Sequence, residues 1–317
     1  MALKAGAIRF NTDSGQLKIY DGTQWTEISA SSTEQLTGGT RGVFGGSNNV
    51  MDYVQIPTTG DAIDFGDLSE TFFINKALGG RIRGIFAGDR PATNKIEFIT
   101  FSSTGDSTDF GDLSESREDP AGVSNGIRGC FGGGAPYPTN VNTIDYITIS
   151  QTGNAVDFGD LTRTTRHHGS CESKTRGLFA GGHADPDSNV IDFITISTTG
   201  NAADFGDTSA SCYGVSGCSN AVRGLFGLGN NGSNSNVVEF VTISTLGNVT
   251  DFGDLSGAKY AQASCSSSVR GLFGGHYPGN NTIDFFQIMS TGNSKDFGDL
   301  TSPRGHFDAC SNGHGGL

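Results

Sequence analysis

The chain has 317 residues, of which 49 are glycine and 34% are hydrophobic, and its formal net charge at pH 7 is −13. This composition is typical of an all-β protein rich in turns rather than of a helical one. The acidic balance argues against a nucleic-acid partner, because phosphate binding needs a clustered excess of Lys and Arg.

The N-terminal residues show no targeting or membrane segment. They lack the apolar core of a signal peptide, and no later stretch reaches the roughly 18 apolar residues that a membrane helix needs. We therefore expect a protein that folds in a cytoplasm and does not insert into a membrane.

Residues 1–36 differ from the rest of the chain. Apolar and polar residues alternate over 6–28 on both sides of a turn signal at 13–15, and Asp21-Gly22 marks a second turn. This pattern predicts a two- or three-stranded β element followed by a linker. Because so short an element buries little surface, we expect it to dock onto the main domain, another copy or a partner.

Six copies of the motif Arg-Gly-hydrophobic-Phe organise residues 37–317. They begin at Arg41, Arg83, Arg128, Arg176, Arg223 and Arg270. Each is followed by an acidic and an aromatic residue, at Asp52-Tyr53, Glu97-Phe98, Asp145-Tyr146, Asp192-Phe193, Glu239-Phe240 and Asp284-Phe285. The motif Asp-Phe-Gly-Asp comes next, beginning at Asp64, Asp109, Asp157, Asp204, Asp251 and Asp296.

The spacing of these motifs indicates a repeat protein. The acidic residue stands 12 residues before Asp-Phe-Gly-Asp in all six copies, whereas the distance from Arg to the acidic residue runs from 11 to 17. Insertions therefore fall in one loop per repeat. If the repeats are arranged about an axis, these variable loops share one face.

Each repeat predicts four strands. In the copy at 161–207 they cover about 168–173, 177–180, 190–197 and 203–205, and the turn at 198–201 joins the last two as a hairpin. The third strand has apolar residues on both faces, so both faces must be covered. A four-stranded antiparallel sheet that packs on both sides against its neighbours is a propeller blade.

The C-terminal residues bear on how the repeats close. Residues 302–315 repeat the segment that precedes each Arg-Gly motif, but no such motif follows them, while the first repeat has only a weak version of this segment around Leu36. We expect the C-terminal strand, which carries Cys310, to complete the first blade and close a six-bladed ring. The alternative is that the stretch around Leu36 takes this place and leaves the C-terminal strand surplus.

Four of the six cysteines occupy one repeat position, here called the apolar slot, which lies five residues before the Arg position. They are Cys171, Cys218, Cys265 and Cys310, and the same slot holds Leu78 and Val123 in other repeats. A slot that accepts Leu, Val or Cys calls for a buried apolar group, so we interpret these cysteines as packing residues. No Cys-x-x-Cys or His-x-x-x-His spacing indicates a metal site, and we expect no cofactor.

The Asp-Phe-Gly-Asp motif contains the Asp-Phe-Gly of protein kinases, but six copies without His-Arg-Asp exclude that function. We expect its two Asp side chains to accept hydrogen bonds from turn amides or to pair with a repeat Arg. The Arg would then tie neighbouring blades through these carboxylates.

Two resemblances follow from these motifs. Pro-Arg, then Arg-Gly-Leu-Phe-Gly-Gly, a variable loop and Asn-Thr-Ile-Asp-Phe resemble the kelch repeat, although Phe stands where kelch has Trp. This implies a kelch-like β-propeller over residues 41–317. Residues 6–28 resemble a hairpin common at the start of tailed-phage fibre and virion proteins, and the Asp-Phe-Gly-Asp-Leu repeats resemble repeat proteins of marine cyanophages. This implies a virion protein that is assembled in the host cytoplasm.

The variable loops supply the candidate binding site. In a propeller, the loops between the second and third strands and the loops that lead into the first strand open on the same face. Tyr, His and Arg on this face suit glycan or protein contacts, through ring stacking and bidentate hydrogen bonds. The residues predicted to bind are Tyr137, His183, His276, Tyr277, Arg163, Arg166, His167 and His168. The alternative is that these are unselected surface turns.

These patterns lead to one function and two alternatives. We expect a non-enzymatic virion structural protein, such as a tail fibre, appendage or head fibre. It would bind other virion proteins through residues 1–36, occur in multiple copies and present the propeller to a host-surface glycan or protein. One alternative is a capsid or tail decoration or bridging protein without receptor binding. The other is a glycan hydrolase or lyase, which needs two carboxylates near the axis.

Overall fold

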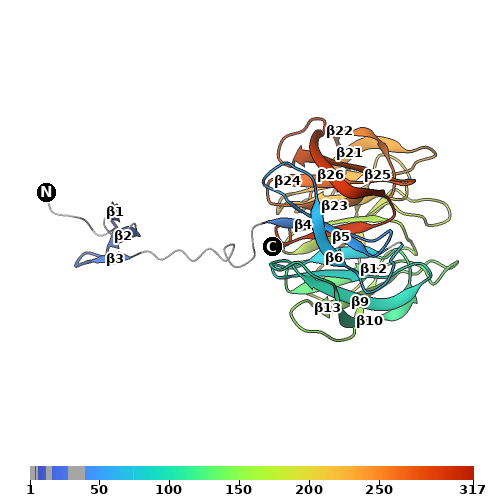
Figure 1. Cartoon of the computed structure of the whole chain (residues 1–317), viewed down its shortest axis with the longest axis horizontal. Helices are drawn as coiled ribbons and strands as arrows, with labels where there is room; N and C mark the ends of the chain where they lie inside the picture. Colours follow the sequence, from blue (N-terminus) through green and yellow to red (C-terminus); the bar gives the residue numbers. More distant parts are fainter. Residues whose placement is uncertain (1–3, 5, 12–15, 28–39, 74) are drawn as a thin grey trace. The chain divides into compact units, whose positions relative to one another are not determined.

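The structure is a computed structural model that describes residues 4, 6–11, 16–27, 40–73 and 75–317. The chain divides into two compact units, Met1–Leu36 and Thr37–Leu317. The regular elements of the described residues are all β-strands (Figure 1). A search of these residues finds no helix that is long and apolar enough to cross a membrane.

The first unit is a small antiparallel sheet in the order β1-β2-β3, built from β1 (Ile8–Asn11), β2 (Gln16–Tyr20) and β3 (Trp25–Glu27). The predicted turn at Asp21 is present, because Asp21 Oδ1 accepts hydrogen bonds from the amides of Gln24 (2.8 Å) and Thr23 (2.7 Å). These bonds, that from Gln24 first, lower the pKa of Asp21 to about 2. The turn predicted at 13–15 lies outside the described residues.

The second unit consists of four-stranded antiparallel sheets arranged like the blades of a propeller (Figure 1). The described residues form six such sheets. From first to fourth strand, five of them are β7 (Lys76–Gly79), β8 (Arg83–Ala87), β9 (Thr93–Thr100), β10 (Thr108–Arg117); β11 (Ala121–Ser124), β12 (Arg128–Gly132), β13 (Thr143–Thr148), β14 (Val156–Asp160); β15 (Gly169–Glu172), β16 (Arg176–Ala180), β17 (Val190–Thr195), β18 (Ala203–Asp207); β19 (Ser216–Ser219), β20 (Arg223–Gly227), β21 (Ser235–Thr242), β22 (Thr250–Lys259); and β23 (Ala263–Ser266), β24 (Arg270–Gly274), β25 (Asn280–Gln287), β26 (Lys295–Arg304).

The remaining sheet joins both ends of the second unit. Its order is β27-β4-β5-β6, formed by β27 (Asp308–Ser311), β4 (Arg41–Gly45), β5 (Val50–Gln55) and β6 (Ile63–Asp67). The C-terminal strand pairs with β4, with Cys310 opposite Val43. Leu36, the alternative candidate for this place, lies outside the described residues. First strands contact one another in the order β7, β11, β15, β19, β23, β27 and again β7.

The Phe of each Asp-Phe-Gly-Asp motif sits at a register shift in the fourth strand. In the sheet of β6, Asp64 pairs with Asp52 and Gly66 with Met51, so Phe65 is the extra residue of a β-bulge. All six of these Phe side chains are only 2% exposed. Each meets the third-strand aromatic ring of its own sheet edge to face, with ring centroids 5.9 to 6.2 Å apart. The motif therefore fills the space between neighbouring sheets.

The Arg of the Arg-Gly motif has a different partner from the one predicted. Each guanidinium lies over the third-strand aromatic ring, 4.3 to 4.9 Å from its centroid. Its Nη1 donates a hydrogen bond to a backbone carbonyl of the next sheet, and the last of these bonds runs from Arg270 back to Ile56 (3.1 Å). The Arg thus ties neighbouring sheets, as expected, but through carbonyl oxygens rather than carboxylates.

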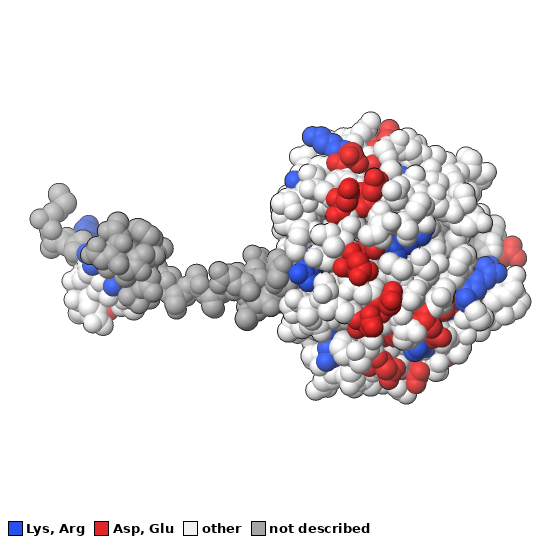
Figure 2. Space-filling model, viewed as in Figure 1, with Lys and Arg blue, Asp and Glu red and all other residues white. Residues whose placement is uncertain are grey.

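The prediction for the Asp side chains of Asp-Phe-Gly-Asp is wrong. In the described part of the chain their carboxylates accept no hydrogen bond and form no ion pair, because the bulge leaves them at the rim. Figure 2 shows acidic side chains in a row over β22, β26, β6 and β10. The buried acid of the third strand makes the ion pairs instead: Asp52 with Arg304, Glu97 with Lys95, Asp145 with Arg117, Asp192 with Arg163 and Asp284 with Lys259.

The backbone of the same motif links the sheets. The amide of Gly105, in the turn before β10, donates to the carbonyl of Phe65 in β6 (2.7 Å), and the amide of Gly60 donates to Phe297 in β26 (2.8 Å). Equivalent bonds recur between the other neighbouring sheets. A Cβ atom at Gly66 would lie 2.5 Å from the Gly105 backbone, which explains the Gly of the motif.

The repeat cysteines pack as predicted. All six cysteines of the chain are free and buried. A Cβ atom at Gly42 would lie 2.6 Å from Cys265 Sγ, so the Gly after the Arg leaves room for the side chain in the apolar slot. Burial raises the pKa of Cys130 and of Cys212 to about 12, which keeps these thiols protonated and unreactive.

Candidate functional site

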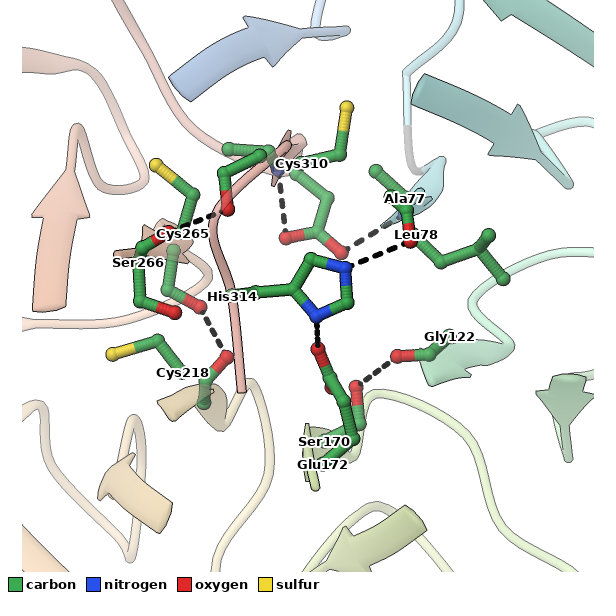
Figure 3. A pocket seen from close by; sticks show the side chains of 16 residues that line it. Ala77, Leu78, Gly122, Ser170, Glu172, Cys218, Cys265, Ser266, Cys310 and His314 are labelled. Carbon is green, nitrogen blue, oxygen red and sulfur yellow. Dashed lines mark hydrogen bonds and ion pairs between the residues drawn. The ribbon is translucent and has the colours of Figure 1, made fainter. Parts of the chain in front are cut away.

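The C-terminal segment fills one end of the axis around which the first strands lie. His314 reaches into a pocket lined by all six first strands, where Nδ1 lies 2.5 Å from Glu172 Oε1 and Nε2 lies 2.8 Å from the Gly79 carbonyl oxygen (Figure 3). Around it, the hydroxyls of Ser311, Ser266 and Ser219 each donate to a carbonyl of the neighbouring first strand. This end of the axis is therefore occupied by the chain itself.

The opposite end of the axis forms a second pocket, here called the axial mouth. Its lining residues precede or begin the six first strands: Asn75, Lys76, Asp119, His167, Gly214, Ala261, His306 and Phe307. Because these segments lead into the first strands, the pocket lies on the face that also carries the loops between second and third strands.

Two adjacent repeat positions build the axial mouth. The residue four places before the apolar slot has a positive φ, between 51° and 66°, at Asp119, His167, Gly214, Ala261 and His306. Side chains rarely adopt this left-handed conformation, and the sheets on both sides hold it in place. The position before it carries Phe73, Glu118, Arg166, Tyr213, Tyr260 and Gly305.

Aromatic rings gather on one side of the axial mouth. The ring of His306 has its centroid 4.6 Å from that of Tyr277, 5.3 Å from Tyr260 and 5.6 Å from Phe73. The row continues through Tyr213, whose centroid is 5.4 Å from Tyr260. It therefore offers apolar ring faces and phenol hydroxyls side by side.

Charged groups gather on the other side. Glu118 lies 3.6 Å from Arg90 Nε and 3.3 Å from Arg166 Nη1. Both guanidinium groups also flank the ring of Tyr137, at 5.5 and 5.2 Å from its centroid, and Tyr137 is 58% exposed. The neighbouring carboxylate of Asp119 contacts His167 Nε2. Donors and acceptors thus stand next to an exposed aromatic face.

The surroundings shift several pKa values at this site. Burial, and then the Asp119 charge, raise the pKa of Glu118, although Arg90, Arg166 and His167 oppose them. Burial lowers the pKa of His306 to about 4, with His167 adding to the effect. Burial, with Tyr213, raises the pKa of Tyr260 to about 12. At neutral pH the His306 ring and the Tyr260 phenol are therefore uncharged, and Glu118 binds a proton more readily than a carboxyl in water.

These shifts predict an acid-sensitive fold. The native pKa of His306, about 4, lies below its ordinary 6.5, so the unfolded chain binds more protons in this window. Its contribution to stability is present above pH 6.5 and is lost as the pH falls towards 4. His306→Gln should remove up to about 3 kcal/mol of this decline. Urea unfolding at a series of pH values measures it, and parallel curves for both proteins would contradict the assignment.

The structure brings together five of the eight residues predicted from the variable loops. Tyr137, Arg166 and His167 belong to the charged side, Tyr277 belongs to the aromatic side, and the ring of His183 lies 5.8 Å from Tyr213. Their proximity follows from paired loops, because Arg166 and His183 form an isolated backbone bridge. Whether these residues bind a ligand stays a prediction.

The other three predicted residues have contacts of their own. Arg163 pairs with Asp192 at 3.0 Å and donates to the carbonyls of Gly181 and Val190, both at 2.7 Å. His168 is 1% exposed, and burial places its pKa well below the ordinary value. His276 Nδ1 lies 2.6 Å from the Tyr277 carbonyl oxygen. Arg163 and His168 lie beneath the surface that a ligand would touch.

The sequence-based prediction missed several residues of the axial mouth. They are Phe73, Arg90, Glu118, Asp119, Tyr213, Tyr260 and His306. Aligning the repeats on the apolar slot would have found most of them, because the fourth and fifth residues before a nearly uniform slot vary from repeat to repeat. Arg90 instead belongs to a loop between second and third strands.

Comparisons with known proteins support the fold and leave the family open. No protein-family model and no curated protein matches the sequence. Many solved structures match. One of them, titled "Structure of YjhT", has a TM-score of 0.61 and 9% sequence identity, and the match covers 75% of this chain and 87% of that chain. At this identity the likeness shows a propeller-like all-β fold.

The structural match also corrects the prediction that the chain has no enzyme activity. That prediction depended on the absence of a catalytic motif from the sequence, whereas the chain shares its fold with YjhT across sequences that are only 9% identical. Reactive residues in such a fold come from different blades and leave no local motif. We therefore no longer exclude catalysis.

Proposed function

We propose that the second unit is a closed, six-bladed, kelch-like β-propeller that binds a host-surface ligand at the axial mouth. Three sets of contacts support ring closure: the first strands, the Arg-to-carbonyl bonds and the turn glycines each run from the last sheet to the first. Pairing β27 with β4 holds both ends of the unit in one sheet.

The observation that carries the proposal is the convergence of aromatic rings, guanidinium groups and carboxylates on one face. Aromatic faces stack on the apolar faces of sugar rings, while Arg and carboxylate groups donate to and accept from hydroxyls. The opposite end of the axis is filled by His314. A glycan is therefore the ligand that these side chains suit best, and an exposed protein loop is the runner-up.

The proposal includes a place in a tailed-phage virion, with residues 1–36 as the anchor. Its support is the resemblance of residues 6–28 to phage fibre proteins and the position of the linker. Arg41 N donates to Asn312 Oδ1 (2.8 Å), so the chain enters the second unit at the end of the axis that the C-terminal segment fills. The axial mouth is then free to face outwards. A decoration protein would share this anchor but would bind no host glycan.

An equilibrium binding measurement tests the site. The full chain is applied to an array of immobilised bacterial surface glycans beside two variants. Tyr137→Ala with Tyr277→Ala removes two exposed rings of the site, and each loss should weaken binding about tenfold. Leu246→Ala, which is 55% exposed on a turn between third and fourth strands, is the control and should bind normally. Equal binding by all three proteins would contradict the proposed site.

A second candidate function is hydrolysis of the bound glycan. The observation in its favour is Glu118, because a carboxyl whose pKa is raised by burial can act as a general acid, and Asp119 beside it supplies a second carboxylate. Release of reducing ends from a glycan that the protein binds would favour this function over binding alone.

A further inference from the structure

A groove lies on the second unit away from the axial mouth. Its volume is about 710 Å³, and it is lined by the turns between first and second strands of neighbouring sheets together with the last two residues of the chain. Ile82 and Ile127 line it and are 64% and 73% exposed. An exposed pair of aliphatic side chains beside a groove is typical of an interaction surface.

The groove carries unused positive charge in an acidic protein. Arg81 and Lys174 line it, both are exposed, and neither forms an ion pair or a hydrogen bond with any residue that the structure describes. The equivalent repeat positions hold Gly126, Ala221 and Ser268. The basic character therefore belongs to this side of the molecule alone, and it favours an acidic occupant with an aliphatic side chain.

The same molecule presents a feature of that description. Ile63, at the start of β6, is 60% exposed and stands between the exposed residues Asp61 and Asp64. The segment is held in place because Gly60 N donates to Phe297 O (2.8 Å) and Ala62 N donates to Asp299 O (2.7 Å). It is thus a preorganised aliphatic projection flanked by carboxylates, here called the Ile63 projection.

We propose that the Ile63 projection of one copy of this chain packs into the Arg81–Lys174 groove of a second copy. Aliphatic surface then meets aliphatic surface, and the carboxylates of Asp61 and Asp64 meet two unpaired cations. We choose a second copy as the occupant because both halves of the contact exist on this chain. The two surfaces differ, so each bound copy still has a free groove or a free projection, and the contact builds open chains of molecules. This inference is independent of the ligand at the axial mouth.

Sedimentation velocity of the full chain tests the contact. The average mass should rise with protein concentration and should fall when salt is added, because the contact is partly ionic. Arg81→Glu with Lys174→Glu should weaken association at least about tenfold. Ile63→Asp should do the same. The matched controls are Lys295→Glu, an exposed base elsewhere, and Val156→Asp, an aliphatic residue that is 54% exposed beside another motif Asp. Both controls should associate like the wild type.

A mixing experiment separates this contact from any other. The groove variant retains its projection and the Ile63→Asp variant retains its groove, so an equal mixture should form pairs that grow no further. Circular dichroism confirms that each variant is folded. A wild type that stays at the same mass at every concentration, variants that associate as well as the wild type, or a mixture that grows into longer chains would each overturn the proposal.

Discussion

Deleting residues 302–317 is expected to prevent the second unit from folding. The deletion removes β27, so β4 loses its partner strand, and β7 and β23 lose the neighbour that lies between them. It also removes Phe307 and Cys310, which are 1% and 3% exposed. The lost burial and pairing should exceed the roughly 5–15 kcal/mol by which a domain of this kind is stable. Thermal unfolding followed by circular dichroism should show no cooperative transition.

A rearranged chain provides the control for this deletion. Residues 302–314 are moved to precede Thr40, which gives the sheet of β4 the same strand connectivity as the other sheets. The rearranged chain should fold, because its first strand is present in the same place. A truncated chain that melts like the full-length protein would contradict the role given to β27.

Arg117→Met is expected to have the largest effect of any single substitution considered for the second unit. Arg117 and Asp145 are both fully buried, Arg117 Nη2 lies 2.5 Å from Asp145 Oδ2, and Nη1 donates to the Thr143 carbonyl (2.8 Å). Removing the guanidinium leaves a buried carboxylate without its cation, which costs about 3–5 kcal/mol. Urea unfolding measures the loss.

Two further substitutions calibrate this result. Arg117→Lys should retain part of the stability, because Lys259 pairs with Asp284 at 2.7 Å at the equivalent place in another sheet. Lys295→Met removes an exposed cation and should change the free energy of unfolding by less than about 0.5 kcal/mol. If Arg117→Met were as mild as Lys295→Met, the third-strand ion pairs would not contribute to stability as argued.

Much of the sheet organisation is predictable from the sequence because its signals are repeated six times. For the copy at 161–207, the predicted strands agree with β15, β16, β17 and β18 to within a few residues. The unmatched C-terminal segment around Cys310 correctly indicates the partner of β4. The apolar slot also gives the right environment for the cysteines, since a position that accepts Leu or Val in place of Cys has to be buried.

Side-chain partners were harder to predict because a β-bulge changes which way residues face. Strict alternation along the fourth strand gives no reason for Phe65 to be an extra residue, yet the register shift at Phe65 leaves Asp64 exposed and the third-strand Asp52 buried. The axial mouth posed a different difficulty. Its residues come from six sheets, and only the closing of the repeats around an axis brings Glu118 near His306 and Tyr260.

The most direct test of the proposed function is binding of the full-length protein to intact cyanobacterial cells, with and without the exposed rings of the axial mouth. The account predicts saturable binding by the wild type, retained by Leu246→Ala and strongly reduced by Tyr137→Ala with Tyr277→Ala, although all three proteins melt alike. Binding that does not depend on Tyr137 and Tyr277, or no binding by the wild type to any susceptible host, would contradict a receptor site at the axial mouth.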